Sequence, residues 1–315
     1  MKRENVFFVL MLLLFFFFCF LINSYAPSAF GSTGFSFMKA SEIDLLRPLS
    51  KEKINQLYLD SNNFLSVFVN PDENKEVVLS EKKSNEVIPI ASLSKLMMAV
   101  VSLENYKLDD TVTISHSAIA SYADAGGLKE NEKISVKDLL YVTLIESNNN
   151  GAEALAENMG RSAFILKMNK KAAELGMKNT RFVNPSGLDV FSDSTQKDLK
   201  ETNVSTASDL EKLVVYILKN YPLIPQILSL PEKTLVSTSG VTHKVQNTNI
   251  LLKENSSYLW GKTGYTKEAN GCIILILKSY SEDDKGYIIN VITGANDRFK
   301  EARKLEAWLS ESFIW

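Results

Sequence analysis

The sequence predicts an α/β (α+β) fold: an antiparallel sheet made from both chain ends, flanked by helices, with an inserted all-helical subdomain. Segments rich in β-forming residues occur near 64–80 and again near 257–293. Between them, from about 105 to 235, apolar residues recur at helical spacing. One late segment, Cys272 to Leu277, is apolar without alternation, so helices are expected on both faces of that strand.

Composition excludes several functional classes. The 315 residues include 35 Lys plus Arg and 37 Asp plus Glu, a net charge of −2 without a basic stripe, so nucleic acid is not an expected partner. The chain holds only two histidines, His116 and His243, and two cysteines, Cys19 and Cys272. These counts exclude a Cys-rich zinc site and a disulfide framework, and we expect no metal. Any catalysis must therefore use little or no imidazole.

The N-terminus predicts export. Lys2 and Arg3 precede an unbroken apolar run from Val6 to Ile22, which suits a signal peptide or an N-terminal membrane anchor over residues 1–30. Both interpretations place the rest of the chain outside the cytoplasm. Residues 31–58 are predicted to be a linker, and 59–315 a single domain. Membrane contact is expected only through the N-terminal segment.

The first elements of that domain are a hairpin and a helix. Phe64 to Asn70 alternates and is followed by a turn signal at 71–74 and a second strand at 75–80. A helix is predicted to begin near Ser92. Its spacing places Ser92 and Lys95 on one face, away from the apolar face.

The middle of the chain predicts successive helices. Ser135 with Asp138 forms a capping-box pattern before one helix, and Asn150 with Glu153 is predicted to cap the next. The segment 147–149 is therefore expected in a tight turn between two helices. Further helices are predicted at about 163–175 and 206–219.

The C-terminal part returns to strands. Three are predicted, at 257–265, 272–278 and 287–293, with turns between them. The last element is a helix with apolar residues facing inward: Phe299, Ala302, Leu305, Leu309 and Phe313.

Three short motifs could carry chemistry. One helical turn places the Lys95 amine beside the Ser92 hydroxyl, where a neutral lysine can act as a base. Ser147 and Asn149 lie in the turn between two helices. Lys262-Thr263-Gly264 lies on a predicted strand, where a cation and a hydroxyl can hold a carboxylate and the glycine allows close approach. Each motif alone is common.

Together, in this order and on these elements, the motifs resemble the signature of penicillin-recognising serine enzymes. The flanking segments resemble low-molecular-weight D-alanyl-D-alanine carboxypeptidases and endopeptidases, the S11 serine peptidases. The resemblance covers roughly residues 60–315 and implies a β-lactamase/transpeptidase-like fold. The segments that carry it are 89–97, 139–156, 182–189, 247–249, 261–266 and 298–308.

The resemblance implies roles for the catalytic residues. Ser92 is the nucleophile that attacks the carbonyl between two D-alanines and forms an acyl-enzyme, which water then hydrolyses. Lys95 is its base, which requires a pKa lowered by burial and by a nearby cation. Ser147 relays a proton to the leaving amine. Asn149 orients Lys95 and the substrate amide.

The resemblance also implies a binding site and partners. Lys262 and Thr263 bind the terminal carboxylate beside Gly264, and Lys244 lies where relatives often carry a basic partner for it. The backbone N–H groups of Ser92 and Tyr265 form the oxyanion hole. The implied partners are peptidoglycan stem peptides and, as covalent inhibitors, β-lactam antibiotics. No cofactor is implied.

The sequence departs from the family pattern at four places, one of which, Ser94 in place of the commoner Thr, is conservative. Asn148 stands where relatives have Gly and is bulkier, which can narrow the turn; because Asn150 can still cap the helix, we expect only a small effect. The segment 269–271 reads Ala-Asn-Gly where relatives have Ala-Gly, which puts the local strand geometry in question. About fifty residues follow Gly264, so no C-terminal β-domain is expected.

The predicted function is a serine D-alanyl-D-alanine carboxypeptidase. The alternative is a D,D-endopeptidase that cuts peptidoglycan cross-links. A class A β-lactamase is disfavoured because no matching Glu is evident in the segment 184–187. An inactive wall-binding module is a further alternative.

Overall fold

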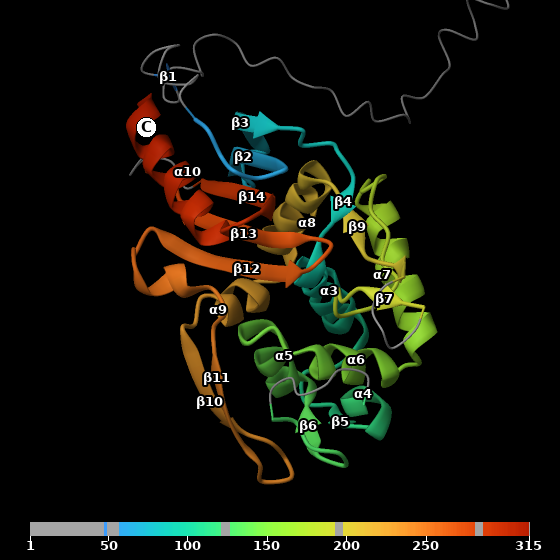
Figure 1. Cartoon of the computed structure of the whole chain (residues 1–315). Helices are drawn as coiled ribbons and strands as arrows, with labels where there is room; N and C mark the ends of the chain where they lie inside the picture. Colours follow the sequence, from blue (N-terminus) through green and yellow to red (C-terminus); the bar gives the residue numbers. More distant parts are fainter. Residues whose placement is uncertain (1–46, 49–56, 121–126, 193–197, 281–285, 315) are drawn as a thin grey trace, which may run out of the picture. The chain divides into compact units, whose positions relative to one another are not determined.

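The computed structural model describes residues 47–48, 57–120, 127–192, 198–280 and 286–314 (Figure 1). From Leu46 to Trp315 the chain forms one compact unit. The N-terminal apolar run, Cys19 and most of the expected linker lie outside the described residues. Within the described ranges, no helix has both the length and the apolar composition needed to cross a membrane.

A five-stranded antiparallel sheet combines the two ends of the domain, as the sequence predicts. Its strands are β2 (Asn63–Asn70), β3 (Lys75–Lys82), β12 (Tyr258–Thr266), β13 (Asn270–Lys278) and β14 (Tyr287–Ala295). Their spatial order is β12-β13-β14-β2-β3, which leaves β12 at one edge (Figure 1). The junction between the two chain ends is the β14–β2 pairing, in register at Ile289 and Val67.

Helices cover both faces of this sheet, and the apolar strands explain why. In β13, Ile274 and Ile276 join the core beneath α3 (Lys95–Asn105) and α8 (Ala207–Asn220), whereas Ile273 and Leu275 join the core beneath α10 (Arg298–Ser312). Because successive side chains of a strand point to opposite faces, a strand buried on both sides needs apolar residues at every position. The expectation for the run from Cys272 is confirmed.

The region between the two sheet-forming segments is mostly helical. It contains α4 (His116–Ala120), α5 (Val136–Ile145), α6 (Asn149–Glu157), α7 (Arg161–Glu174) and α9 (Leu223–Leu228), besides α8. It is not all-helical, because it also holds a hairpin, β10 (Glu232–Val236) with β11 (Thr242–Gln246), which projects beyond α5 and α9 (Figure 1). This hairpin was not predicted from the sequence.

Several short two-stranded sheets pair segments of the loops. They are β5 (Thr111–Thr113) with β6 (Lys133–Ser135), β4 (Ile88–Pro89) with β9 (Val204–Ser205), and β7 (Val190–Phe191) with β8 (Leu199–Glu201). A fourth pair, β1 (Arg47–Pro48) with β15 (Phe313–Ile314), joins the start of the unit to its end. Phe313 is thus buried in a strand and not in the last helix.

The N-cap predicted for one helix agrees with the structure, and the N-cap predicted for another differs from it. Ser135 caps α5 and accepts a hydrogen bond from the Asp138 N–H at 3.0 Å, as predicted. The cap of α6 is Asn148, whose Oδ1 accepts from the Gly151 N–H at 2.9 Å. Asn150 is already the second residue of that helix. The prediction that Asn150 caps it was therefore wrong.

Candidate active site

Ser92 lies on a tight 3₁₀ turn, η1 (Ala91–Ser94), immediately before α3 begins at Lys95. The helix that the sequence places at Ser92 therefore starts as a 3₁₀ turn. Ala91 has φ +46°, and its carbonyl accepts a hydrogen bond from the Ser94 hydroxyl at 2.7 Å. Asn203 donates to that hydroxyl at 2.9 Å, so the turn is held from a second segment of the chain. Ser92 itself is half-buried.

The Lys95 amine is fully buried and has three polar neighbours. It lies 2.9 Å from Ser92 Oγ, 2.8 Å from Asn149 Oδ1 and 2.6 Å from the carbonyl oxygen of Ser186. The two carbonyl oxygens can only accept hydrogen bonds. A neutral amine has two N–H groups and one lone pair, so it can donate to both carbonyls and direct its lone pair at the Ser92 hydroxyl. The arrangement suits a base that removes the Ser92 proton.

Burial holds the pKa of Lys95 well below its ordinary value, and the nearby Lys262 cation lowers it further. The carboxylate of Glu153 acts in the opposite direction. Burial removes water from the ammonium, and a like charge disfavours it further. Burial and a nearby cation, the two causes expected from the sequence, therefore both lower the pKa of Lys95.

A second buried lysine faces the turn between α5 and α6. Lys262 Nζ lies 2.8 Å from Ser147 Oγ and 2.9 Å from the Thr263 carbonyl oxygen. Burial lowers the pKa of Lys262 to about 7, with a further contribution from Arg298. As a cation, Lys262 in turn disfavours a second positive charge on Lys95. Ser147, which has φ +62°, lies within reach of a proton held by Lys262.

Strand β12 passes close to the nucleophile because residue 264 is glycine. A β-carbon at Gly264 would lie 3.0 Å from the backbone nitrogen of Ser92 and 3.1 Å from the Ala91 side chain. The next residue, Tyr265, is 62% exposed at the edge strand. The pairing of Tyr265 with Gly271 continues to Thr266 with Asn270, so the departure at residues 269–271 leaves this end of the hairpin paired.

The structure brings together most of the predicted site residues. Ser92, Lys95 and Asn149 form one hydrogen-bonded group, and Ser147, Lys262 and Thr263 form another. Lys244 is exposed on the β10–β11 hairpin, opposite Thr234. Within the described residues it makes no hydrogen bond with either group.

Asn148, the departure from the family pattern in the middle motif, takes the capping role that was predicted for Asn150. Its side chain points along α6 as the N-cap, and its amide nitrogen donates to Glu146 at 3.0 Å. Asn148 is therefore part of the support for the Ser147 turn.

Three further residues belong to the site and were missed. Ser186 supplies the carbonyl acceptor for Lys95, and Thr248 Oγ1 lies 2.7 Å from Thr263 Oγ1. Arg298, the first residue of α10, has a buried Nε with no hydrogen-bond partner in the described part of the chain and lies close enough to affect Lys262. The only signals in the sequence were the family-like segments containing these residues, which assign no role.

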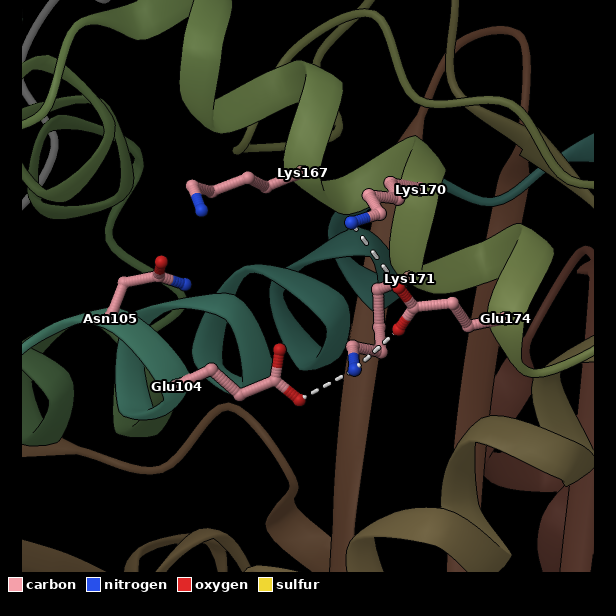
Figure 2. Close-up of a pocket in the computed structure, with 6 residues that line it drawn as sticks. All are labelled: Glu104, Asn105, Lys167, Lys170, Lys171 and Glu174. Atoms are coloured by element: carbon pink, nitrogen blue, oxygen red, sulfur yellow. Dashed lines mark ion pairs between the residues drawn. The ribbon is translucent and has the colours of Figure 1, made fainter.

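A separate hollow lies between α3 and α7 (Figure 2). Lys171 of α7 contacts Glu104 of α3 at 2.9 Å across it and Glu174 of its own helix at 2.8 Å, with Lys167 and Lys170 alongside. None of the site residues above lines it. It is a surface feature held by ion pairs.

The fold and these contacts form a candidate serine-hydrolase site in which a buried lysine amine, and not a histidine ring, lies beside the serine hydroxyl. Residues 62–296 match the family described as D-alanyl-D-alanine carboxypeptidase, Peptidase S11. The chain belongs to this family of serine peptidases. The predicted family, fold class and enzyme class are confirmed.

Relatives include both kinds of D,D-peptidase. The chain is 34% identical over 250 residues to a D-alanyl-D-alanine endopeptidase of Pseudomonas aeruginosa, covering 76% of this chain and 74% of that protein. It is 34% identical to the D-alanyl-D-alanine carboxypeptidase DacF of Bacillus subtilis, covering 66% of this chain and 52% of that one. Among solved structures, penicillin-binding protein D2 of Listeria monocytogenes in its ampicillin-bound form is 30% identical, with a TM-score of 0.65, covering 81% of this chain and 99% of that one.

Proposed function

We propose that this chain is a D-alanyl-D-alanine carboxypeptidase, which removes the terminal D-alanine from peptidoglycan stem peptides through an acyl-enzyme on Ser92. The contact that supports this proposal best is the buried Lys95 amine, 2.9 Å from Ser92 Oγ and fixed by two carbonyl acceptors. A base held in this way needs no histidine.

The reaction follows from the positions of the two lysines. Ser92 Oγ attacks the carbonyl between the two D-alanines while Lys95 takes the hydroxyl proton. The backbone N–H groups of Ser92 and Tyr265 hold the oxyanion. Collapse breaks the C–N bond, and Ser147 passes a proton from the lysine pair to the leaving D-alanine amine. In the second step Lys95 takes a proton from water, the resulting hydroxide attacks the ester and breaks its bond to Ser92 Oγ, and Lys95 gives the proton back to Ser92 Oγ.

The terminal carboxylate of the substrate is held at the other end of the site. Lys262 supplies charge and the Thr263 hydroxyl supplies a hydrogen bond, with Thr248 fixing the rotamer of Thr263. Arg298 has an N–H that remains unpartnered within the described residues and adds a second cation. Lys244 is a further candidate at the rim. A site with this much positive charge favours a substrate with a free carboxylate.

The test is the intact mass of the purified chain after incubation with benzylpenicillin, beside a Ser92→Ala variant. We expect β-lactams to act as covalent inhibitors, so one adduct should form and be absent from the variant. A pentapeptide ending in D-Ala-D-Ala should release D-alanine. An unmodified chain with intact drug would favour the inactive wall-binding module, and an unmodified chain with hydrolysed drug would favour a β-lactamase.

The second candidate is a D,D-endopeptidase that cuts peptidoglycan cross-links. It is favoured by the greater coverage of the Pseudomonas aeruginosa endopeptidase, 74% of its length against 52% for the Bacillus subtilis carboxypeptidase. The chemistry at Ser92 is the same in both cases. Cleavage of cross-linked dimers without release of D-alanine from a pentapeptide would select this function.

We propose also that the domain works outside the cytoplasm, as a substrate in the cell wall requires. The support is the basic start of the chain followed by the apolar run 6–22. Digestion of intact spheroplasts with an external protease tests the location, because an extracytoplasmic domain is cleaved while cytoplasmic proteins survive.

A further inference from the structure

A buried carboxylate lies one helical turn beyond the residue that holds the catalytic lysine. Asn149, the first residue of α6, accepts a hydrogen bond from Lys95, and Glu153 follows it at i+4 on the same helix. Residues at this spacing lie on one face, with β-carbons about 5–6 Å apart. The Glu153 side chain is only 1% exposed. A charged carboxylate at such a position requires compensation.

Arg161, the first residue of α7, supplies that compensation. Its Nε donates to Glu153 Oε2 at 2.8 Å and its Nη2 lies 3.4 Å from Glu153 Oε1. The Arg161 side chain is 43% exposed, so a charge at the surface neutralises a charge behind the active site. A two-pronged contact of this kind fixes the orientation of the carboxylate.

The charged groups around Lys95 come from several elements. Lys262 of β12 disfavours a positive charge on Lys95, and Arg298 of α10 disfavours a positive charge on Lys262. Glu153 is the acidic group that acts on Lys95 in the described part of the chain.

The other charged groups near α6 are paired elsewhere. Glu157, one turn after Glu153, accepts from the Ser115 hydroxyl. On α4, His116 is exposed and lies 3.0 Å from Glu130.

Glu146, at the end of α5, accepts from Asn148 at 3.0 Å, and burial raises its pKa. Glu153 and Arg161 are thus the charged pair on this side whose carboxylate acts electrostatically on Lys95.

We propose that Glu153 and Arg161 form a positioning pair that sets the pH range in which Lys95 is an effective base, with Arg161 cancelling the field of Glu153. Without Arg161, the buried carboxylate holds a proton on Lys95 and slows attack by Ser92. Without Glu153, Lys95 loses its proton more readily. The inference rests on the proposed function and concerns the regulation of the same site.

The experiment measures the rate of acylation by benzylpenicillin between pH 5 and 9 for the purified full chain. The variants are Glu153→Gln, Arg161→Gln, Arg161→Lys and the double variant Glu153→Gln/Arg161→Gln. We expect the acid limb to move down by about one pH unit in Glu153→Gln and up by about one unit in Arg161→Gln, a change of about tenfold in rate on that limb. The double variant should return towards the wild-type limb because its net charge is unchanged, and Arg161→Lys should restore most of it.

A matched ion pair elsewhere serves as the control. Arg303 contacts Glu254 at 2.6 and 2.7 Å on the surface, and Arg303→Gln should leave the limb in place. If Arg161→Gln fails to fold, as judged by its melting curve, Glu153→Gln and Arg161→Lys still decide the question. Reduced stability with an unmoved limb in all variants would overturn the inference, because the pair would then only join α6 to α7. A wild-type chain that is not acylated would instead overturn the proposed function.

Discussion

The backbone of Gly187 lies against the carbonyl of Ala91, the residue directly before Ser92. A β-carbon at position 187 would lie 1.9 Å from the Ala91 oxygen and 2.9 Å from the Ser94 hydroxyl. Ser186, the preceding residue, supplies the carbonyl that binds Lys95. One short loop therefore supports both the nucleophile turn and the base.

Replacing Gly187 with alanine should destabilise the domain by about 2–4 kcal/mol. The added methyl group overlaps the Ala91 backbone, and φ +87° is strained for any residue with a β-carbon. We expect acylation of Ser92 to slow as well, because the turn must move. The measurements are urea unfolding and the acylation rate. Gly240→Ala is the matched control, since φ there is +81° but nothing lies within 4 Å. Equal losses at the two positions would show that strain alone matters.

The second prediction concerns the N-cap of α6. Asn148→Ala removes the acceptor for the Gly151 N–H and should cost about 1 kcal/mol, whereas Asn148→Gly should cost only a few tenths. Asn150→Ala is the comparison, because Asn150 Oδ1 has no hydrogen-bond partner in the described residues. We expect Asn148→Ala to lose the most stability of the three variants, and urea unfolding of each variant tests this. A larger loss from Asn150→Ala would restore the cap that the sequence predicts.

The error at this helix shows what the sequence can and cannot decide. Asn148 and Asn150 are both good capping residues, so the sequence does not decide which of them precedes the helix. In the structure Ser147 has φ +62° and is held from another part of the chain by the hydrogen bond from Lys262, and Asn148 is the cap. At α5 the sequence offers one capping residue in the right place, and the prediction holds.

The site was predictable where the motif and the local structure coincide. Ser92 and Lys95 share one turn, so their contact follows from spacing. Arg298 comes from the start of the last helix, and nothing in its local sequence indicates that it approaches Lys262. The β10–β11 hairpin could have been found from the alternation at Thr242–Gln246 after a Ser-Gly turn, but each strand has only five residues.

Cys272 should be unreactive in the folded chain. Its thiol is fully buried in β13, and burial raises its pKa to about 11, so almost no thiolate is present at neutral pH. Incubation with iodoacetamide followed by peptide mass spectrometry should find Cys272 unmodified in the native chain and alkylated in urea. Rapid alkylation of the native chain would show that strand β13 opens and that the Cys272 thiol is accessible.

The stability of the domain should fall between about pH 4.5 and 8 because of Glu211. This residue of α8 is 6% exposed, and its Oε1 has no hydrogen-bond partner among the described residues. Burial raises the pKa of Glu211 to about 8, and the nearby Glu76 adds repulsion that Lys212 partly offsets.

The direction of this pH dependence follows from the number of protons bound by the folded and the unfolded chain. Between pH 4.5 and 8 the folded chain keeps a proton on Glu211 that the unfolded chain releases, so unfolding becomes easier as pH rises. The free energy of unfolding should fall by up to about 1.4 kcal/mol per pH unit in that window and stop falling above it. Glu211→Gln should remove this slope and be more stable than the wild type at pH 8.5. Urea unfolding at half-unit pH steps measures both, with the exposed Glu232→Gln as control. A wild-type slope that survives in Glu211→Gln would assign it to other groups, since a neutral amide at 211 has no proton to lose.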